Sequence, residues 1–258
     1  MIYVVLGIGF SGTTLVSELI HHSGIKMIDN ESDDYDQGGK YEHPDFQKIN
    51  MNILELLDDK VFHLRIADCP DNLTPKQNDA MVKLVNRQNI RYQDWGFKDP
   101  RTVVTYPLWR KLLPEHRIIA IYRDPAGNWP RYRWRGLRKR YSNSWRAYVH
   151  LRQWVEYNEE ILNTGAKHGA DFILLNYEKL MSSTLELDRF SDFLDRPVED
   201  RRKSGMHRNR SQGDMLFRAI RWLMNFGPYS PEKMLKRLED THAVQCHAFK
   251  KKTVTEHK

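Results

Sequence analysis

The feature that most constrains this chain is its start, where an apolar run leads directly into a glycine-containing loop and a helical pattern. Residues Ile2–Leu6 are all apolar, the loop GIGFSGTTL spans Gly7–Leu15, and apolar residues continue at helical spacing to Ile20. A strand, a turn and a helix start in this order gather backbone N–H groups and the positive end of a helix dipole around one point. The sequence therefore predicts an anion site directly after a first buried strand.

The spacing inside this loop is that of a phosphate-binding P-loop with one substitution. Gly7 and Gly12 enclose four residues, and Thr14 stands where the P-loop has Ser or Thr. Thr13 takes the place of the lysine that reaches the β- and γ-phosphates in nucleoside triphosphatases. The hydroxyl of Ser11 adds a further donor near the helix start. The loop is therefore typical of a phosphate site, and it favours a phosphorylated donor other than ATP.

Apolar runs and helical patterns alternate along most of the chain. Further buried strands are expected at Trp95–Lys98, Arg117–Tyr122 and Asp171–Asn176, with a short one at Lys26–Ile28. Helices are expected at residues 13–22, 46–57, 75–88, 102–113, 145–162, 185–194, 214–226 and 231–240. This alternation predicts an α/β fold in which helices cover both faces of a central parallel sheet.

We expect a single domain over residues 1–258, with a core at 1–200 and a basic loop and C-terminal helices at 201–258. Hydrophobic residues make up 40% of the 258, enough for a sizeable core. The two cysteines imply no disulfide framework, so a reducing, cytoplasmic location is expected. No stretch approaches the roughly 18 apolar residues of a membrane-spanning helix. The histidines and cysteines lack metal-ligand spacing, so no metal is expected.

Cationic residues follow two of the predicted strands. Lys98 and Arg101 lie in GFKDPR, and Arg123 begins the Arg-Asp-Pro corner after the strand at 117–122. Ligands of parallel sheets bind at the carboxyl ends of the strands, so these cations and the first loop are expected to converge. An arginine leaving a buried strand suits bidentate phosphate binding. The alternative for Arg123 is a structural ion pair with Asp99 or Asp124.

The ordered set GxxxSGTT, GFKDPR, IIAIYRDP and LLNYEKL resembles the sulfotransferases that use PAPS (3′-phosphoadenosine 5′-phosphosulfate) as donor. The resemblance covers roughly residues 1–200 and implies the three-layer, P-loop-like architecture related to nucleotide kinases. It implies in-line transfer of a sulfuryl group to a hydroxyl or amine of an acceptor, with PAP (3′,5′-bisphosphoadenosine) as product.

The resemblance also assigns roles to residues of this chain. In the family the first loop holds the 5′-phosphosulfate, and the matching positions here are Gly9, Phe10, Ser11, Gly12, Thr13 and Thr14. Arg123 matches the arginine that holds the 3′-phosphate, and Lys98 matches a lysine near the transferring group. The Tyr177-Glu178 pair is a family landmark that we interpret as structural.

Two positions depart from the family pattern. Phe10 stands where the family has the Lys or Arg that stabilises the departing phosphate oxygen. Arg131 stands where the family has a serine that touches the 3′-phosphate, and an arginine there is expected to keep phosphate binding with altered geometry. Lys98 or Arg101 is expected to take over from the missing cation.

Two adjacent residues are candidates for the general base that accepts the acceptor proton. Glu42 lies at a distance after the loop comparable to that of a catalytic glutamate in some family members, and His43 titrates nearer neutrality. Either residue could instead mark a helix start, where carboxylates are favoured electrostatically.

The acceptor side is less defined. Residues 125–155 contain no acidic residue and mix arginines with aromatics, which favours a lid or an acceptor-entry segment. We expect a small-molecule, glycan or lipid acceptor, with an anionic one compatible with the net charge of +7, and we do not expect nucleic acid. A P-loop kinase-like phosphotransferase and a non-catalytic anion- or nucleic-acid-binding protein stay as alternatives. The oligomeric state is left open.

Overall fold

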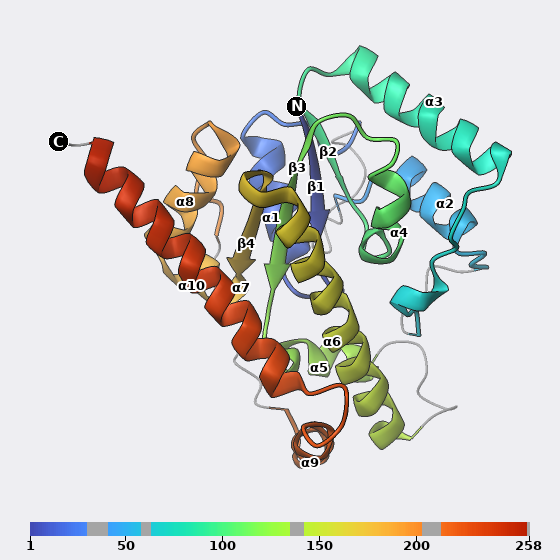
Figure 1. The fold of residues 1–258 in the computed structure, drawn as a ribbon, viewed down its shortest axis with the longest axis vertical. Helices are drawn as coiled ribbons and strands as arrows, with labels where there is room; N and C mark the ends of the chain where they lie inside the picture. Colours follow the sequence, from blue (N-terminus) through green and yellow to red (C-terminus); the bar gives the residue numbers. More distant parts are fainter. Residues whose placement is uncertain (30–40, 58–62, 135–141, 203–212, 257–258) are drawn as a thin grey trace.

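The computed structural model describes residues 1–29, 41–57, 63–134, 142–202 and 213–256, and its centre is a parallel β-sheet (Figure 1). Its strands are β1 (Ile2–Leu6), β2 (Trp95–Lys98), β3 (His116–Tyr122) and β4 (Phe172–Asn176), and among the described residues their order is β2-β1-β3-β4. All three pairings are parallel. Apolar residues dominate these strands, as burial on both faces requires.

The register brings the carboxyl ends of three strands together. Val5 pairs with Lys98 at the end of β2, and Leu6 pairs with Ala120 near the end of β3. Tyr122, the last residue of β3, pairs with Asn176, the last residue of β4. The loop after β1 therefore leaves the sheet between the residues that follow β2 and β3.

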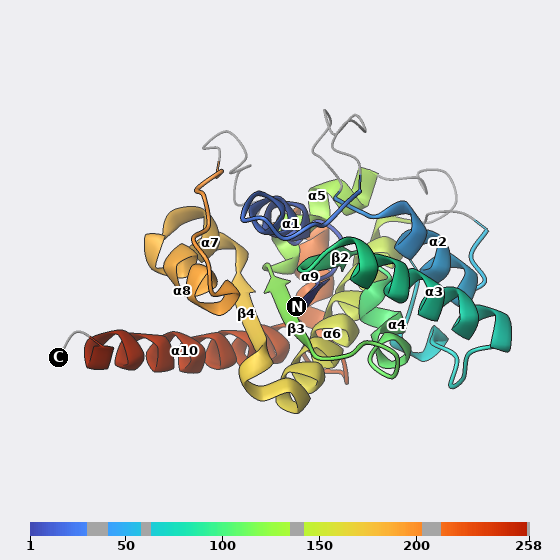
Figure 2. The same cartoon turned by 90° about the horizontal axis from the view of Figure 1, so that it is seen from above.

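Helices cover both faces of the sheet (Figure 2). The helices are α1 (Thr13–His22), α2 (Pro44–Ile53), α3 (Pro75–Arg91), α4 (Thr102–Trp109), α5 (Pro125–Trp134), α6 (Asn143–His168), α7 (Tyr177–Ser182), α8 (Thr184–Leu194), α9 (Met215–Met224) and α10 (Pro231–Glu256). Short 3₁₀ turns lie at Ile66–Asp68 and Gly169–Asp171. The predicted fold class, a parallel sheet between helical layers with a helical C-terminal segment, is confirmed.

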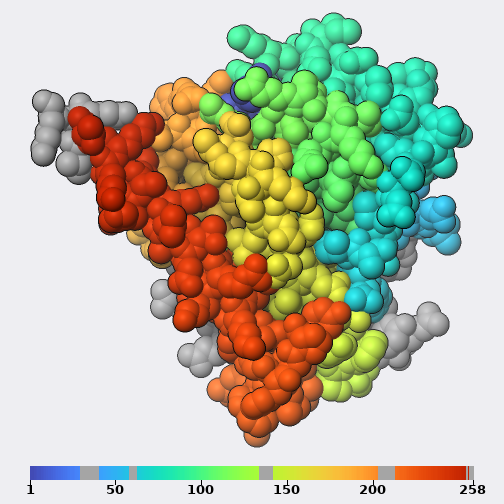
Figure 3. Space-filling model, in the orientation of Figure 1, coloured from blue at the N-terminus to red at the C-terminus, as the bar shows by residue number. Residues whose placement is uncertain are grey.

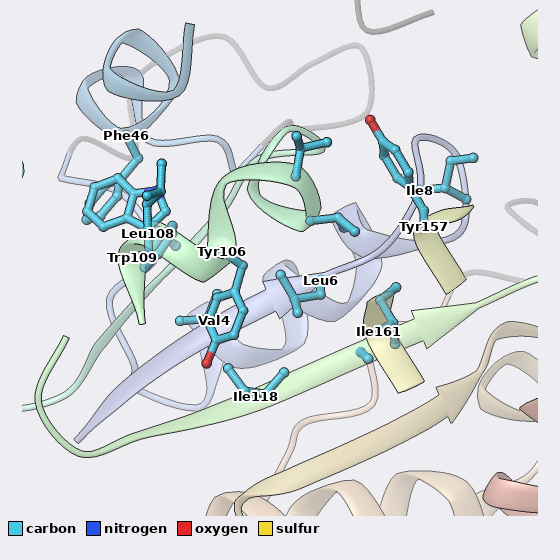
Figure 4. Close-up of a cluster of buried hydrophobic side chains, with 14 of the residues drawn as sticks. Val4, Leu6, Ile8, Phe46, Tyr106, Leu108, Trp109, Ile118, Tyr157 and Ile161 are labelled. Atoms are coloured by element: carbon cyan, nitrogen blue, oxygen red, sulfur yellow. The ribbon is translucent and has the colours of Figure 1, made fainter. Parts of the chain in front are cut away.

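The alternation of side chains along β1 divides the core in two. Val4 and Leu6 point into a cluster with α2, α4 and α6, which includes Trp109 (Figure 4). Tyr3 and Val5 point to the opposite face, where they pack with α1 and α8. Because both faces are buried, β1 is held in the middle of the molecule and fixes where the following loop begins.

Several elements differ from the prediction. The helices predicted at 46–57 and 102–113 end earlier, at Ile53 and Trp109, and the helix predicted at 145–162 extends over Asn143–His168. The short strand expected at Lys26–Ile28 is reduced to an isolated bridge between Lys26 and Trp95. The residues after the Arg-Asp-Pro corner, where no helix was predicted, form α5, and the last helix continues to Glu256 instead of ending near residue 240. Most of the basic loop expected after Arg201 lies at residues 203–212, outside the described residues.

Polar side chains of α8 and α10 cover the outer edge of β4. The Leu174 N–H donates to Gln245 Oε1 (2.9 Å), and the Asn176 N–H donates to Glu186 Oε1 (3.1 Å). Arg189 Nη2 donates to the Leu174 carbonyl (2.7 Å). An open strand edge would leave these backbone groups unpaired. Side chains thus replace a fifth strand, and α10 is fastened along the sheet.

Glu186 lies at the centre of this network. Its contacts predict that the folded state loses stability at acid pH. Its carboxylate accepts from His242 Nε2 (2.9 Å) and from Arg189 Nη2 (3.0 Å). Burial by itself raises the pKa of Glu186, but these partners outweigh it and lower the pKa to about 2.

We therefore expect Glu186 to stabilise the fold fully above its ordinary pKa of 4.5 and to lose this contribution as the pH falls towards 2. The pKa difference corresponds to about 3 kcal/mol of unfolding free energy. Urea unfolding between pH 7 and pH 2 measures it. In Glu186→Gln this part of the pH dependence should be absent, and an unchanged pH profile in that variant would contradict the assignment.

Candidate active site

The loop between β1 and α1 has a backbone shape that only certain residues permit. Gly12, the residue before α1, has φ +106°, in the left-handed region that favours glycine. A Cβ at Gly12 would also collide with the ring of Tyr177. Phe10 adopts φ +70°, which is uncommon for a residue with a side chain. The strained backbone is held by a turn in which the Ser11 N–H donates to the Ile8 carbonyl (3.1 Å).

Ser11 offers a buried hydroxyl inside this loop. Its side chain is 0% exposed, and its Oγ atom has no hydrogen-bond partner among the described residues. A Cβ placed on Gly7 would lie 2.7 Å from this oxygen, so the hydroxyl points into the loop. An unsatisfied buried hydroxyl costs about 1–3 kcal/mol. A bound anion would satisfy it, so the polar group is consistent with a ligand site.

The start of α1 adds backbone donors to the same place. Within the described part of the chain no side chain caps the helix at Gly12, and the Val16 N–H bonds back to the Gly12 carbonyl (3.1 Å). The N–H groups of the first turn have no partner within their own helix. The side chain of Thr13 is buried, whereas Gly9 and Thr14 are half-buried. The predicted loop residues thus surround one helix N-terminus with the geometry that favours an anion.

Arg123 is joined to this loop through one aromatic ring. Its guanidinium carbon lies 4.3 Å from the ring centroid of Tyr177, and the same ring contacts Gly12. Arg123 Nε donates to Glu178 Oε1 (3.2 Å). The sequence interpretation treated the Tyr177-Glu178 pair as structural, and the structure shows that both residues contact Arg123 and orient it beside the loop.

The corner that carries Arg123 is fixed by α6. Trp154 Nε1 donates to the Arg123 carbonyl (2.9 Å), and His150 Nε2 lies 3.2 Å from the Pro125 carbonyl oxygen. Complete burial lowers the pKa of His150 to about 4, so this ring is neutral at physiological pH and Nε2 carries the donated proton. The start of α5 is therefore rigidly placed next to the end of β3.

Arg131 is brought to the loop by α5. Its guanidinium carbon lies 5.7 Å from the ring centroid of Phe10, and the arginine side chain is exposed. A guanidinium over an aromatic face is attracted by the ring quadrupole. The two positions that depart from the family pattern are thus in contact, a relation that the sequence spacing did not indicate.

Lys98 and Glu42 form an ion pair at the end of β2. Lys98 Nζ lies 2.8 Å from Glu42 Oε1. The lysine side chain is 2% exposed, whereas that of Glu42 is 17% exposed. The ammonium is therefore buried against the carboxylate of Glu42, whose side chain keeps some contact with solvent. A carboxylate so placed can take a proton from an incoming group.

Arg101 has a different environment from Lys98. Its Nη1 donates to Asp99 Oδ1 (2.9 Å), and Asp99 also accepts from Asn50 Nδ2 (3.3 Å). Arg101 and Asp99 are buried. Asn50 in turn accepts from Thr105 and Trp109 of α4. The pair belongs to a buried network that fastens α2 to α4.

His43 caps the start of α2. Its Nδ1 accepts from the Asp45 N–H (3.2 Å), and its Nε2 lies 3.3 Å from Asp29 Oδ2 and 3.1 Å from Gln88 Nε2. Burial lowers the pKa of His43, although the neighbouring carboxylates act against this shift. Both ring nitrogens are engaged within the protein. Of the two predicted base candidates, Glu42 has the more exposed side chain, 17% against 6% for His43.

One group of potential metal ligands occurs among the described residues, away from the loop: Glu186, His242 and Cys246. Arg189 already binds the Glu186 carboxylate, and Lys179 Nζ lies 3.4 Å from His242 Nδ1. A metal ion would have to displace or repel these two cations. The group therefore acts as a hydrogen-bonded network at the edge of β4.

Comparison with known proteins agrees with this architecture. The sequence model of the Sulfotransferase family matches residues 3–200. The chain therefore belongs to the sulfotransferase family. A comparison with curated proteins found no match.

Two solved structures share the fold. The sulfotransferase domain from the curacin biosynthetic pathway aligns with a TM-score of 0.52 at 16% identity, covering 92% of this chain and 96% of that domain. The sulfotransferase domain from the Synechococcus PCC 7002 olefin synthase aligns with a TM-score of 0.50 at 18% identity, covering 94% of each chain. At these identities the likeness concerns the fold.

Proposed function

We propose that this protein transfers a sulfuryl group from PAPS to a hydroxyl or amine of an acceptor and releases PAP. The observation that carries the proposal is the contact of Tyr177 with both Gly12 and Arg123. It joins the helix N-terminus of the loop to a cation at the end of β3. A donor with a 5′-phosphosulfate and a 3′-phosphate needs two anion sites of this kind, side by side.

The loop residues are suited to the 5′-phosphosulfate. Ser11 has a buried hydroxyl that a ligand oxygen would satisfy, and a Cβ placed on Gly9 would meet no described atom within 4 Å, which leaves room for a group to approach the backbone. Arg123 would hold the 3′-phosphate end. Arginine suits this role because its planar guanidinium binds phosphate in a bidentate manner. Arg131, which the family resemblance places at the 3′-phosphate, is proposed instead for the 5′-phosphosulfate, because its guanidinium lies over the ring of Phe10 in the loop.

Glu42 and Lys98 have the arrangement that the transfer requires. In the proposed step the acceptor oxygen bonds to sulfur, the bond from sulfur to the 5′-phosphate oxygen breaks, and the acceptor proton passes to Glu42. Lys98 and Arg131 supply positive charge close to the groups that become more negative. Fixed charges of this kind stabilise a transition state without reorganisation.

For the acceptor we propose a small molecule, glycan or lipid. The sources of the two solved structures, a biosynthetic pathway and an olefin synthase, support a small-molecule acceptor. We propose that α5 and the start of α6 flank the acceptor entrance. Residues 135–141, which belong to the predicted entry segment, lie outside the described residues.

Removal of the Arg123 guanidinium should weaken binding of PAP selectively. We expect Arg123→Met to raise the Kd for PAP about 10- to 100-fold, since a hydrogen bond to a charged group contributes about 1.5–3 kcal/mol. Binding of 5′-AMP, which lacks the 3′-phosphate, should change little. Isothermal titration calorimetry with both nucleotides measures the difference.

Arg117→Met is the matched control, because Arg117 lies at the other end of β3 and pairs with Asp195. It should leave both affinities unchanged. Equal losses for PAP and 5′-AMP in Arg123→Met would contradict the assignment of this residue to the 3′-phosphate. Thermal stabilisation of the wild type by ATP–Mg²⁺ instead of PAP would contradict the proposed donor and favour the phosphotransferase alternative.

A further inference from the structure

Helix α9 and the turn after it carry an apolar stripe that the described part of the protein leaves exposed. Its large side chains are exposed to the following fractions: Met215 82%, Leu216 40%, Trp222 61%, Leu223 56% and Phe226 76%. At about 100° per residue these positions fall on one side of the helix. Figure 1 places α9 at one end of the molecule, away from the sheet, and Figure 3 shows this end at the surface. Exposed apolar patches of this kind mark interaction sites.

The exposed stripe is separate from the face of α9 that packs against the rest of the protein. Phe217 is fully buried and stacks on Trp129, with ring centroids 5.0 Å apart. Met224, two turns further along, is buried in the same cluster as Tyr132 and Leu151. The helix therefore has one apolar face for its own core and a second apolar face that the described residues leave uncovered.

Polar contacts hold α9 firmly against the proposed donor site. Asp214 accepts from the Phe217 N–H at the helix start (2.9 Å), and its other oxygen accepts from Trp129 Nε1 and Arg133 Nη1 (both 2.9 Å). Arg221 Nη1 lies 2.8 Å from Asp124 Oδ1. Because Asp124 follows Arg123 directly, the exposed stripe is anchored to the corner that we assign to the donor.

Positive charge flanks the stripe. Arg218 is exposed, and Arg221 lies one helical turn further on the same polar side. Residues 213–237 contain five lysines and arginines and two acidic residues, a net charge of +3. Arg221 itself is bound by both Asp124 and Glu232, so the exposed positive charges of this segment include Arg218 on α9 and Lys233 and Lys236 at the start of α10. An anionic surface would therefore be attracted to the same side of the molecule that offers the apolar stripe.

We propose that the exposed face of α9 docks onto an anionic phospholipid bilayer. Trp and Phe next to Leu and Met, with the exposed Arg218 on the adjacent side, have the composition of helices that lie in the membrane interface. Trp222 and Phe226 pack edge to face, 5.0 Å between centroids, so the aromatic pair is ready to insert together. Docking would bring the Arg123 corner close to a bilayer from which a lipid acceptor could enter. The docking does not depend on the identity of the donor.

A second copy of the chain fits this face less well. In a two-fold dimer the same patch meets itself, so the Arg218 side chains of the two copies would approach each other. Five apolar side chains on one short helix are also far fewer than the about 20–30 residues per side of a stable interface. A bilayer needs neither symmetry nor a large protein surface.

Vesicle sedimentation tests the proposal. The full chain should sediment with vesicles of phosphatidylcholine and phosphatidylglycerol (3:1), bind vesicles of phosphatidylcholine alone much less, and release on addition of 0.5 M NaCl. We expect the triple variant Trp222→Ser, Leu223→Ser, Phe226→Ser to lower the partition coefficient at least tenfold. Ile90→Ser is the matched control, since Ile90 is 86% exposed on α3 and should leave binding unchanged.

A second variant keeps the test independent of folding. Arg218→Glu changes one exposed side chain and should weaken binding to the anionic vesicles only, with an unchanged circular dichroism spectrum. Wild-type protein that binds neither vesicle would overturn the proposal. So would a wild-type dimer that the triple variant converts to a monomer, because the face would then be covered by a second copy. Wild-type protein that binds the anionic vesicles but transfers no sulfuryl group from PAPS would count against the proposed function alone and would still support the docking.

Discussion

Replacing Glu42 with glutamine is expected to lower the rate of sulfuryl transfer by about 10²- to 10⁴-fold, the range that a general base contributes. Glutamine keeps the size of the side chain and an oxygen that can accept from Lys98, which lies 2.8 Å away in the wild type. It cannot accept the acceptor proton. Donor affinity should stay nearly unchanged. Transfer from ³⁵S-labelled PAPS to the best of a panel of phenols, alcohols and amines measures the rate.

His43→Asn is the control for this prediction. Asparagine is a favoured helix N-cap, so the variant keeps the start of α2 while removing the imidazole that now caps it. We expect its transfer rate to stay within a few-fold of the wild type. A wild-type rate in Glu42→Gln combined with a large loss in His43→Asn would reverse the assignment of the base.

The second large effect is expected at Arg131. In the family pattern a cation precedes the Ser-Gly-Thr sequence, where this chain has Phe10, and the structure places the Arg131 guanidinium over that ring at 5.7 Å. If Arg131 supplies the missing charge, Arg131→Ser should lower the transfer rate about 10²- to 10³-fold, as loss of one transition-state donor does elsewhere. Single-turnover kinetics with saturating donor separate this loss from weaker binding.

A compensating change makes this prediction specific. The double variant Phe10→Lys, Arg131→Ser moves the cation back to the loop and restores the serine of the family pattern. We expect the transfer rate of the double variant to be at least tenfold higher than that of Arg131→Ser. Full activity of Arg131→Ser alone would show that Lys98 is sufficient and that the arginine is dispensable.

The sheet was predictable because its signal is local. Each of β1, β2 and β3 is a short apolar run that stops at a polar or glycine residue, and the predicted ends at Leu6, Lys98 and Tyr122 agree with the structure. Burial on both faces makes such runs continuously apolar. The glycine-containing loop after β1 was predictable for a related reason, because its glycines meet backbone requirements of the loop itself, such as the positive φ at Gly12.

Helix α5 was not predictable in this way. Its sequence contains Gly127 and Pro130 and several basic residues, a composition that weakens any helical pattern. What stabilises it comes from elsewhere: α6 binds the corner at its start through Trp154, and Trp129 packs against Phe217 of α9. Tertiary contacts of this kind override local propensity.

The partners of the ion pairs also differ between the sequence prediction and the structure. The sequence allowed Arg123 to pair with Asp99 or Asp124, its neighbours along the predicted strand ends. In the structure Arg123 pairs with Glu178, Asp99 pairs with Arg101, and Asp124 pairs with Arg221. The partners of Arg123 and Asp124 lie 55 and 97 residues away along the chain, so strand order and the paths of the connecting helices select them. The Asp99–Arg101 pair is local, but nothing in the sequence pattern singled it out.

The sequence by itself determined the class of fold, the position of the glycine-containing loop after β1 and the family to which the chain belongs, because strand burial and loop backbone geometry depend on neighbouring residues. The tertiary structure decided which cations face the loop. It joined Nε2 of His43 to Asp29 and Gln88, buried Asp99 and its partner Arg101 against Asn50 of α2, and brought Arg131 to Phe10. These outcomes depend on contacts between elements far apart in the chain, where burial and charge are set by the packed molecule as a whole.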